Sequence, residues 1–309
     1  MNWKRFVFIG LIIAALYGVV VVIGARTSSP FLIVTSLLAT TITVATPLTL
    51  GALSGVFCER SGVVNIGIEG MMLSGAFFGW LTGLYCYEIF KMPALTSQIL
   101  GVLAAMLTGG LMALLHAWLS ITFKVDQIIG GTVINILAVG ISGFLNRQLF
   151  FEKNSVFGGT VPAGPGTLPF IDLQVGKFIN FVCNGGCVEV SKALGELFTQ
   201  KPITILAIVL VVVSNYVLFK TRWGLRTRAV GEHPKAADTV GINVIFMRYA
   251  NVVIGGLLAG LAGAYLTIES IASFEPLMTN GRGFISLAAM IFGNWTPFGA
   301  WAAALVFGA

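Results

Sequence analysis

The sequence predicts an all-α fold, a polytopic bundle of membrane-spanning helices, from two observations. Hydrophobic residues make up 57% of the 309-residue chain and charged residues only 10%, whereas a soluble domain carries about 25% charged residues. The apolar residues also fall into runs of the roughly 20 residues that cross a bilayer. The formal net charge of +6 then orients the spans and does not indicate nucleic-acid binding.

About eight runs meet this length criterion. The first follows Lys4 and Arg5 and is longer than the core of a secretory leader, so we expect an uncleaved span, with a cleaved leader as the alternative. Pro297 divides the last run into two pieces, and the final piece is too short to span, so we expect the natural chain to continue beyond residue 309. The expected spans are 6–24, 31–57, 62–85, 98–122, 128–150, 203–219, 249–271 and 284–309.

The distribution of Lys and Arg predicts that the N-terminus lies inside the cell. If the spans alternate from there, the loops after spans two, four and six are cytoplasmic, and they carry Arg60, Lys124 and a dense basic group within 220–248. Short cytoplasmic loops of membrane proteins are enriched in Lys and Arg. The chain is thus one transmembrane domain, 1–309, with an extracytoplasmic segment at 151–202 and a cytoplasmic segment at 220–248.

Two cysteines of the outer segment, Cys183 and Cys187, flank an Asn-Gly-Gly sequence. Outside the cytoplasm thiols can be oxidised, and the turn could bring the two sulfurs together as a disulfide. The alternative is a pair of buried small apolar residues.

The stretch ERSGVVNIGIEGMML, residues 59–73, places polar groups inside an apolar region. Asn65 and Glu69 are four residues apart and would share one face of a helix. The glycines indicate a broken or re-entrant element, which membranes tolerate where it is buried in protein or lines a cavity. These side chains either line a translocation path or clamp neighbouring helices, and Asn135 is a similar candidate with the same alternative.

No catalytic constellation is visible in the sequence. It has no G-x-x-x-x-G-K-[ST] loop for ATP, no H-E-x-x-H and no C-x-x-C. His116 stands alone among apolar residues and is expected to be a hydrogen-bonded packing residue. We therefore expect a transporter or channel, neither an enzyme nor a metal-binding protein.

The basic segment 221–244 contains a short predicted helix, PKAADTVG. Pro234 suits its first turn and Gly241 its C-terminal cap. A helix of two turns is not stable alone in water, so we expect a partner to hold it. The alternative is a solvated basic loop that only enforces topology.

Four stretches resemble one family: GLRTRAVGEHPKAADTVGINV, ERSGVVNIGIEGMML, DQIIGGTVINILAVGISGFL and GRGFISLAAMIFGNWTPFGA. They are similar to importer permeases of the ATP-binding cassette superfamily, in the branched-chain amino acid, ribose and nucleoside group. They look closest to the nucleoside permeases paired with basic-membrane-protein-type lipoproteins. The resemblance runs from about residue 50 to the end of the chain, and the segment around Cys183 and Cys187 does not match it.

The resemblance implies a short cytoplasmic helix, here Glu232 to Gly241, that docks on a separate ATPase subunit. ATP is then bound by that partner, and this chain needs no cofactor. A second homologous permease, a substrate-binding lipoprotein and a bacterial inner-membrane location with the N-terminus inside are also implied. The residues expected to couple to the ATPase are Gly231, Glu232, Pro234, Ala236, Ala237, Asp238 and Gly241.

The sequence therefore predicts a permease subunit that imports nucleosides by alternating access, driven by a separate ATPase. Simple sugars or other small polar solutes are the alternative cargo within the same class. A stand-alone secondary transporter or channel is the alternative class. The coupling segment argues against that class, because a self-sufficient carrier needs no docking helix.

Overall fold

The computed structural model describes residues 18, 30–152, 156–157, 159–172, 174, 192, 195 and 197–309. The expected first span, apart from Gly18, and the pair Cys183 and Cys187 lie outside the described residues, so both stay predictions. By contacts the chain forms two units. One comprises 1–45, 169–202 and 308–309, and the other comprises 46–168 and 203–307. Every residue of the site described below belongs to the second unit.

The described residues are almost entirely helical, which confirms the all-α membrane fold. Five helical stretches are long and apolar enough to cross a bilayer, and they match expected spans two, four, five, six and seven within a few residues. Their elements are α2 (Pro30–Arg60), α4 (Ala94–Ala117) with η1 (Trp118–Thr122), α5 (Gln127–Asn146) with η2 (Arg147–Phe151), α8 (Pro202–Lys220), and α11 (Val244–Ala264) with η3 (Tyr265–Ile271). Strands β1 (Ile171–Asp172) and β2 (Thr199–Gln200) form one antiparallel pair in the first unit.

Helix α3 (Ile68–Glu88) occupies the core of the second unit and packs against both α4 and α11, which also pack against each other. Glycine makes this close packing possible. A Cβ added at Gly75 would lie 2.7 Å from the Cα of Gly260, and one added at Gly79 would lie 2.7 Å from the Cβ of Ala105. Faces of small residues like these let helices approach closely.

The last expected span is two short helices, α12 (Arg282–Phe292) and α13 (Pro297–Gly308). Between them the backbone turns through Asn294 and Trp295, both left-handed with φ of 54° and 52°. The predicted break before Pro297 is therefore confirmed. Proline begins α13 because its missing N–H costs nothing at a helix start.

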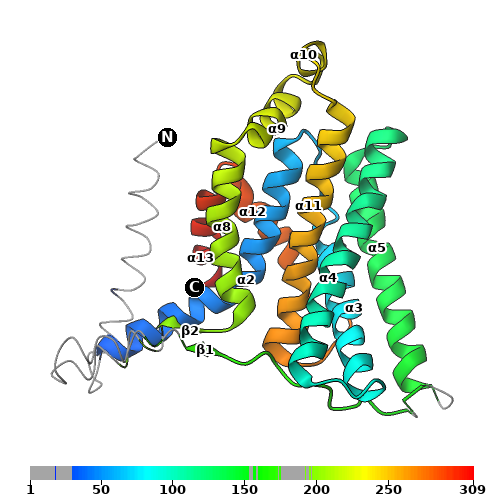
Figure 1. Ribbon diagram of the computed structural model, residues 1–309, viewed down its shortest axis with the longest axis vertical. Helices are drawn as coiled ribbons and strands as arrows, with labels where there is room; N and C mark the ends of the chain where they lie inside the picture. The colour runs from blue at the N-terminus through cyan, green and yellow to red at the C-terminus, as the bar shows by residue number, and fades with distance from the viewer. Residues whose placement is uncertain are drawn as a thin grey trace. The chain divides into compact units, whose positions relative to one another are not determined.

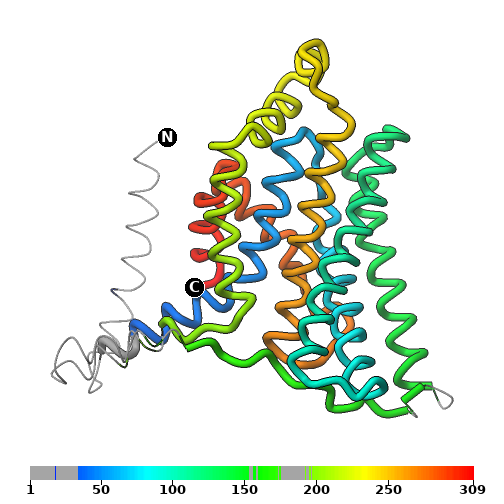
Figure 2. Tube along the Cα trace, in the orientation of Figure 1, coloured from blue at the N-terminus to red at the C-terminus, as the bar shows by residue number. Residues whose placement is uncertain are grey.

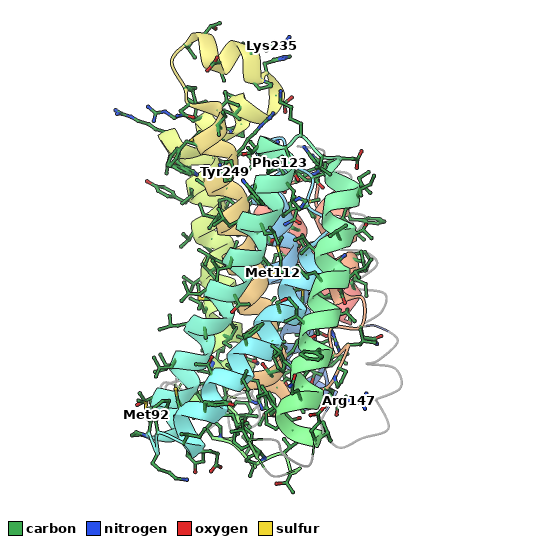
Figure 3. The ribbon with its side chains drawn as sticks, turned by 90° about the vertical axis from the view of Figure 1, so that its right-hand side faces the viewer. Met92, Met112, Phe123, Arg147, Lys235 and Tyr249 are labelled. Carbon is green, nitrogen blue, oxygen red and sulfur yellow. The ribbon has the colours of Figure 1, made fainter. Side chains whose placement is uncertain are left out.

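Two further helices, α9 (Arg222–Glu232) and α10 (Pro234–Thr239), extend beyond one end of the second unit (Figures 1 and 2). In Figure 3, Phe123 and Lys235 lie toward this end, whereas Met92 and Arg147 lie at the opposite end. The loop between α4 and α5 and the segment 220–248 thus share one end, as the alternating topology predicted. Which side of the membrane this end faces stays a prediction.

Candidate translocation pocket and coupling region

The chain is not helical between α2 and α3, in the segment 61–67, although its neighbours are deeply packed. Backbone groups that lie outside the helices need partners of another kind. Side chains supply them. The N–H of Val64 donates to Oε1 of Gln127 (2.7 Å), and Nε2 of His116 donates to the carbonyl of Val64 (3.1 Å). The prediction that His116 is a hydrogen-bonded packing residue is confirmed.

Asn65 and Asn135 complete this support. Oδ1 of Asn65 accepts the N–H of Gly67 (3.0 Å), which is two residues further along the chain. Asn135 on α5 accepts the N–H of Gly70 through Oδ1 (2.7 Å) and donates through Nδ2 to the carbonyl of Ile66 (3.1 Å). The sequence prediction of a broken element is confirmed here, and both asparagines hold its backbone in place.

The expectation that Asn65 and Glu69 share a helical face is wrong. Asn65 precedes the helix, which begins at Ile68. The cause is local: an asparagine side chain that accepts a backbone N–H two residues on offers an alternative to the helical ladder. With 1% of its surface exposed, Asn65 is a brace inside the protein and does not line the pocket described next.

Glu69 lies in the first turn of α3 and reaches the start of α12. Its carboxylate accepts two backbone N–H groups, from Gly281 (2.8 Å) and Gly283 (2.6 Å). These are orphan donors at the positive end of a helix dipole, where a negative charge is stabilising. Gly283 permits the approach, because a Cβ there would lie 2.6 Å from the Cα of Glu69.

A pocket of about 420 Å³ opens between α3, α5 and the start of α12. It brings together Glu69 and Asn135, two of the three path residues that the sequence suggested. Asn135 lies well inside the span Gln127–Phe151, so the pocket is at membrane depth. The lining residues are Glu69, Gly70, Leu73, Asn135, Ile136, Val139, Leu277, Thr279, Asn280, Gly281 and Phe284.

A buried acid, Glu269 in η3, was missed by the sequence analysis. It is fully buried and accepts from the N–H of Ile203 (2.6 Å) and from both the N–H (3.1 Å) and the hydroxyl (2.8 Å) of Thr204. It thereby caps α8 as Glu69 caps α12. The rule that singled out Glu69, an ionisable group within an apolar run, applies equally to Glu269.

The predicted short helix with Pro234 at its start and Gly241 at its end is present as α10. Pro234 is its first residue, and Gly241 follows its end with φ of 82°, a left-handed conformation that suits glycine. The preceding helix α9 was not expected. Its start is capped by the hydroxyl of Thr221, which accepts the N–H of Gly224.

Ala237 does not have the exposure that a direct contact with an ATPase requires. Only 4% of its surface is exposed, because it packs against Val230 of α9 and Met247 of α11. Its role is to hold α10 on its own chain. Of the other expected coupling residues, Glu232, Ala236 and Asp238 are exposed.

Helix α9 contacts the end of α2 directly. A Cβ at Gly231 would overlap the carbonyl oxygen of Arg60, and the guanidinium groups of Arg60 and Arg228 lie 5.7 Å and 5.1 Å from the ring centre of Phe219. Arg60 also donates through Nε to the carbonyl of Trp295 (2.9 Å). The same α2 end leads into the segment 61–67, so one continuous set of contacts runs from α9 to the pocket.

Among the described residues, no three His, Cys, Asp or Glu side chains gather to hold a metal ion. A multi-pass helical bundle with a partly polar pocket at membrane depth, and with a short helix projecting beyond its spans, is the architecture of a transport permease. The chain belongs to the family described as branched-chain amino acid transport system / permease component, whose model matches residues 37–309. It is a multi-pass membrane protein and the permease subunit of an ATP-binding cassette importer.

Similar proteins are known from several organisms. The chain is 42% identical over 270 residues to the guanosine ABC transporter permease protein NupQ of Bacillus subtilis, covering 87% of this chain and 78% of that one. It is 38% identical to the nucleoside ABC transporter permease protein NupC of Lactococcus lactis (85% and 77% covered). It is 34% identical to the putative glucose ABC transporter permease protein TsgC13 of Haloferax volcanii (88% and 74% covered). No solved structure shows a significant match.

Proposed function

We propose that this permease imports nucleosides across a bacterial inner membrane, with its N-terminus in the cytoplasm. The observation that carries the proposal is similarity over more than four-fifths of the chain to two permeases, one named for guanosine and one for nucleosides. The pocket that contains Glu69 and Asn135 lies on the proposed path. Its volume of about 420 Å³ is within the roughly 300–1,000 Å³ of small-molecule sites.

A separate ATPase subunit binds ATP and docks on α10 and the adjoining surface, so the permease itself carries no cofactor. A groove of about 560 Å³ beside α10, lined by Pro234, Lys235, Asp238 and the start of α11, supports this docking. ATP-driven movement of α10 reaches the pocket through Gly231, the end of α2 and the segment 61–67. Alternating access results if this movement opens the pocket in turn to the two sides of the membrane.

A second, homologous permease and a substrate-binding lipoprotein complete the importer. The pocket supports a second permease, because three apolar side chains of its lining are exposed. Ile136 is 68% exposed, Leu277 58% and Phe284 48%. A second permease would close that side. The lipoprotein would meet the extracytoplasmic side, to which the sequence analysis assigns the segment 151–202.

The test is uptake by the complete importer, reconstituted with its ATPase, its second permease and its binding protein. ATP-dependent accumulation of radiolabelled guanosine or adenosine, competed by other nucleosides and not by glucose, is the expected result. Glucose uptake without nucleoside uptake would instead favour the sugar alternative, which the Haloferax relative also suggests. Uptake by this chain alone, without ATP, would contradict the assigned class.

A further inference from the structure

We infer that the pocket between α3, α5 and α12 binds the nucleoside itself during transport, with a polar edge for the ribose hydroxyls and an apolar wall for the base. This inference rests on the proposed function. It goes further because it assigns the contacts and predicts which chemical groups of the cargo matter.

The polar edge has unused hydrogen-bonding capacity. A carboxylate offers about four acceptor positions, and the two backbone N–H groups of Gly281 and Gly283 occupy two of those on Glu69. The Asn135 amide accepts one hydrogen bond and donates one. One N–H donor and one acceptor position of this amide therefore remain unused. Two neighbouring hydroxyls of a ribose could donate to Glu69 while Asn135 accepts or donates at the same edge.

Thr279 and Asn280 add polar side chains that form no hydrogen bond with the described residues. Thr279 is 1% exposed and lines the pocket, and its hydroxyl has no hydrogen-bond partner in the described part of the chain. The Asn280 side chain is exposed and also lacks a partner among those residues. Both groups are available to a ligand.

The rest of the lining is largely apolar. Leu73, Ile136, Val139 and Leu277 supply aliphatic surface, and Phe284 supplies an aromatic ring. Ligand sites commonly combine such walls with a few polar groups that set the orientation. A purine or pyrimidine is flat and largely apolar on its faces, so it suits this wall better than a simple sugar does.

The charge of the lining further limits which solutes the pocket can bind. Glu69 is its single charged residue, and none of the lining residues is Lys or Arg. A phosphate group would be repelled and would find no cation, since phosphate recognition relies on Arg and Lys. A free amino acid would leave its carboxylate without a partner. The pocket therefore favours a neutral nucleoside over its monophosphate.

Protection of an introduced cysteine tests this inference. Phe284→Cys lines the pocket, and Phe292→Cys is the matched control, because Phe292 is 73% exposed on the same helix and lies outside the pocket. Both are labelled with a methanethiosulfonate reagent in the assembled importer in nanodiscs, with the unsubstituted complex giving the background. Guanosine at about ten times its dissociation constant should slow labelling at residue 284 about tenfold by mass action and leave residue 292 unchanged.

Analogues then test the assigned contacts. Guanosine monophosphate should not protect, and 2′,3′-dideoxyguanosine should protect more weakly than guanosine. Thr279→Val and Asn280→Gly, combined with Phe284→Cys, should reduce protection by guanosine. Asn280 has φ of 44°, so glycine removes the side chain without backbone strain. Asn294→Gly, at another exposed left-handed asparagine, is the matched control and should leave protection intact.

The outcomes separate this inference from the proposed function. If the Phe284→Cys importer itself still accumulates guanosine but no nucleoside protects residue 284, the pocket assignment is wrong and the function stands. Equal protection by the monophosphate, or protection at residue 292 as well, would also overturn the assignment. If the complex accumulates no nucleoside at all, the proposed function itself fails.

Discussion

Gly231 occupies a position where no side chain fits. A Cβ would overlap the carbonyl oxygen of Arg60, which is fixed backbone at the end of α2. We predict that Gly231→Ala forces α9 away from α2 and lowers stability by about 1–3 kcal/mol, the usual cost of overpacking. Thermal unfolding of the purified protein in detergent measures this, and ATP-driven uptake should fall with it.

Gly140→Ala is the matched control for that substitution. It lies within α5, and a Cβ there would meet nothing within 4 Å. Alanine is better than glycine in a helix by about 1 kcal/mol, so the melting temperature should stay or rise. An equal loss at both positions would show that the contact with Arg60 is not the cause.

Glu269 is predicted to be a structural residue that tolerates no change of its acceptor oxygens. Gln keeps the shape but replaces one oxygen by a donor, so at least one of the N–H groups of Ile203 and Thr204 loses its acceptor. We expect Glu269→Gln to cost about 1–3 kcal/mol. The exposed Glu275 is the control, and Glu275→Gln should change stability by less than about 0.5 kcal/mol.

At the scale of the element, α10 has one face on its own chain and one face free. Ala236→Trp adds bulk to the exposed face, so it should abolish association with the ATPase while the permease keeps its melting temperature. Ala237→Trp adds the same bulk to a side chain that is 4% exposed, so it should lower the melting temperature itself. Co-purification of the ATPase with each tagged variant checks this, and full association by Ala236→Trp would contradict the docking role.

Elements differ in how far the sequence predicts them. Pro234, Gly241 and Pro297 mark helix ends by their own backbone chemistry, and their predictions were confirmed. The start of α3 was predicted wrongly. One cause is local, because Asn65 accepts the N–H of Gly67 two residues further on, and the other is the set of bonds from α4 and α5, whose residues lie 52 to 69 positions away in the sequence. Helix α9 was missed for another reason: its basic residues were assigned to topology, which hid its helical start at Thr221.

On the scale of the whole molecule, the long apolar runs predicted the spans, since span length depends on the bilayer and not on neighbours. The pocket could be predicted only in part. Glu69 and Asn135 were found as polar groups in apolar runs, whereas Thr279 and Asn280 lie within a turn whose position relative to α3 and α5 is a tertiary property.

The alternating topology makes a prediction for the intact protein in its membrane. Cysteines at Lys124 and Lys235 should react with an impermeant maleimide only in inverted vesicles, and a cysteine at Lys91 only in intact spheroplasts. Lys124 follows the α4–η1 helix and Lys91 precedes it, so they mark its two ends. The unsubstituted protein gives the background. Labelling of Lys124→Cys and Lys91→Cys from the same side would contradict the topology.

The segment 61–67 also imposes an order of biosynthesis. Its backbone partners His116, Gln127 and Asn135 come 52, 63 and 69 residues later in the chain. At about 5–20 residues per second, the last of them is synthesised roughly 3–14 s after the segment. Until then, moving it into hydrocarbon would cost several kcal/mol for each unsatisfied backbone group. The segment therefore reaches its final packing only after α5 has been synthesised, so its closure is a late step of assembly.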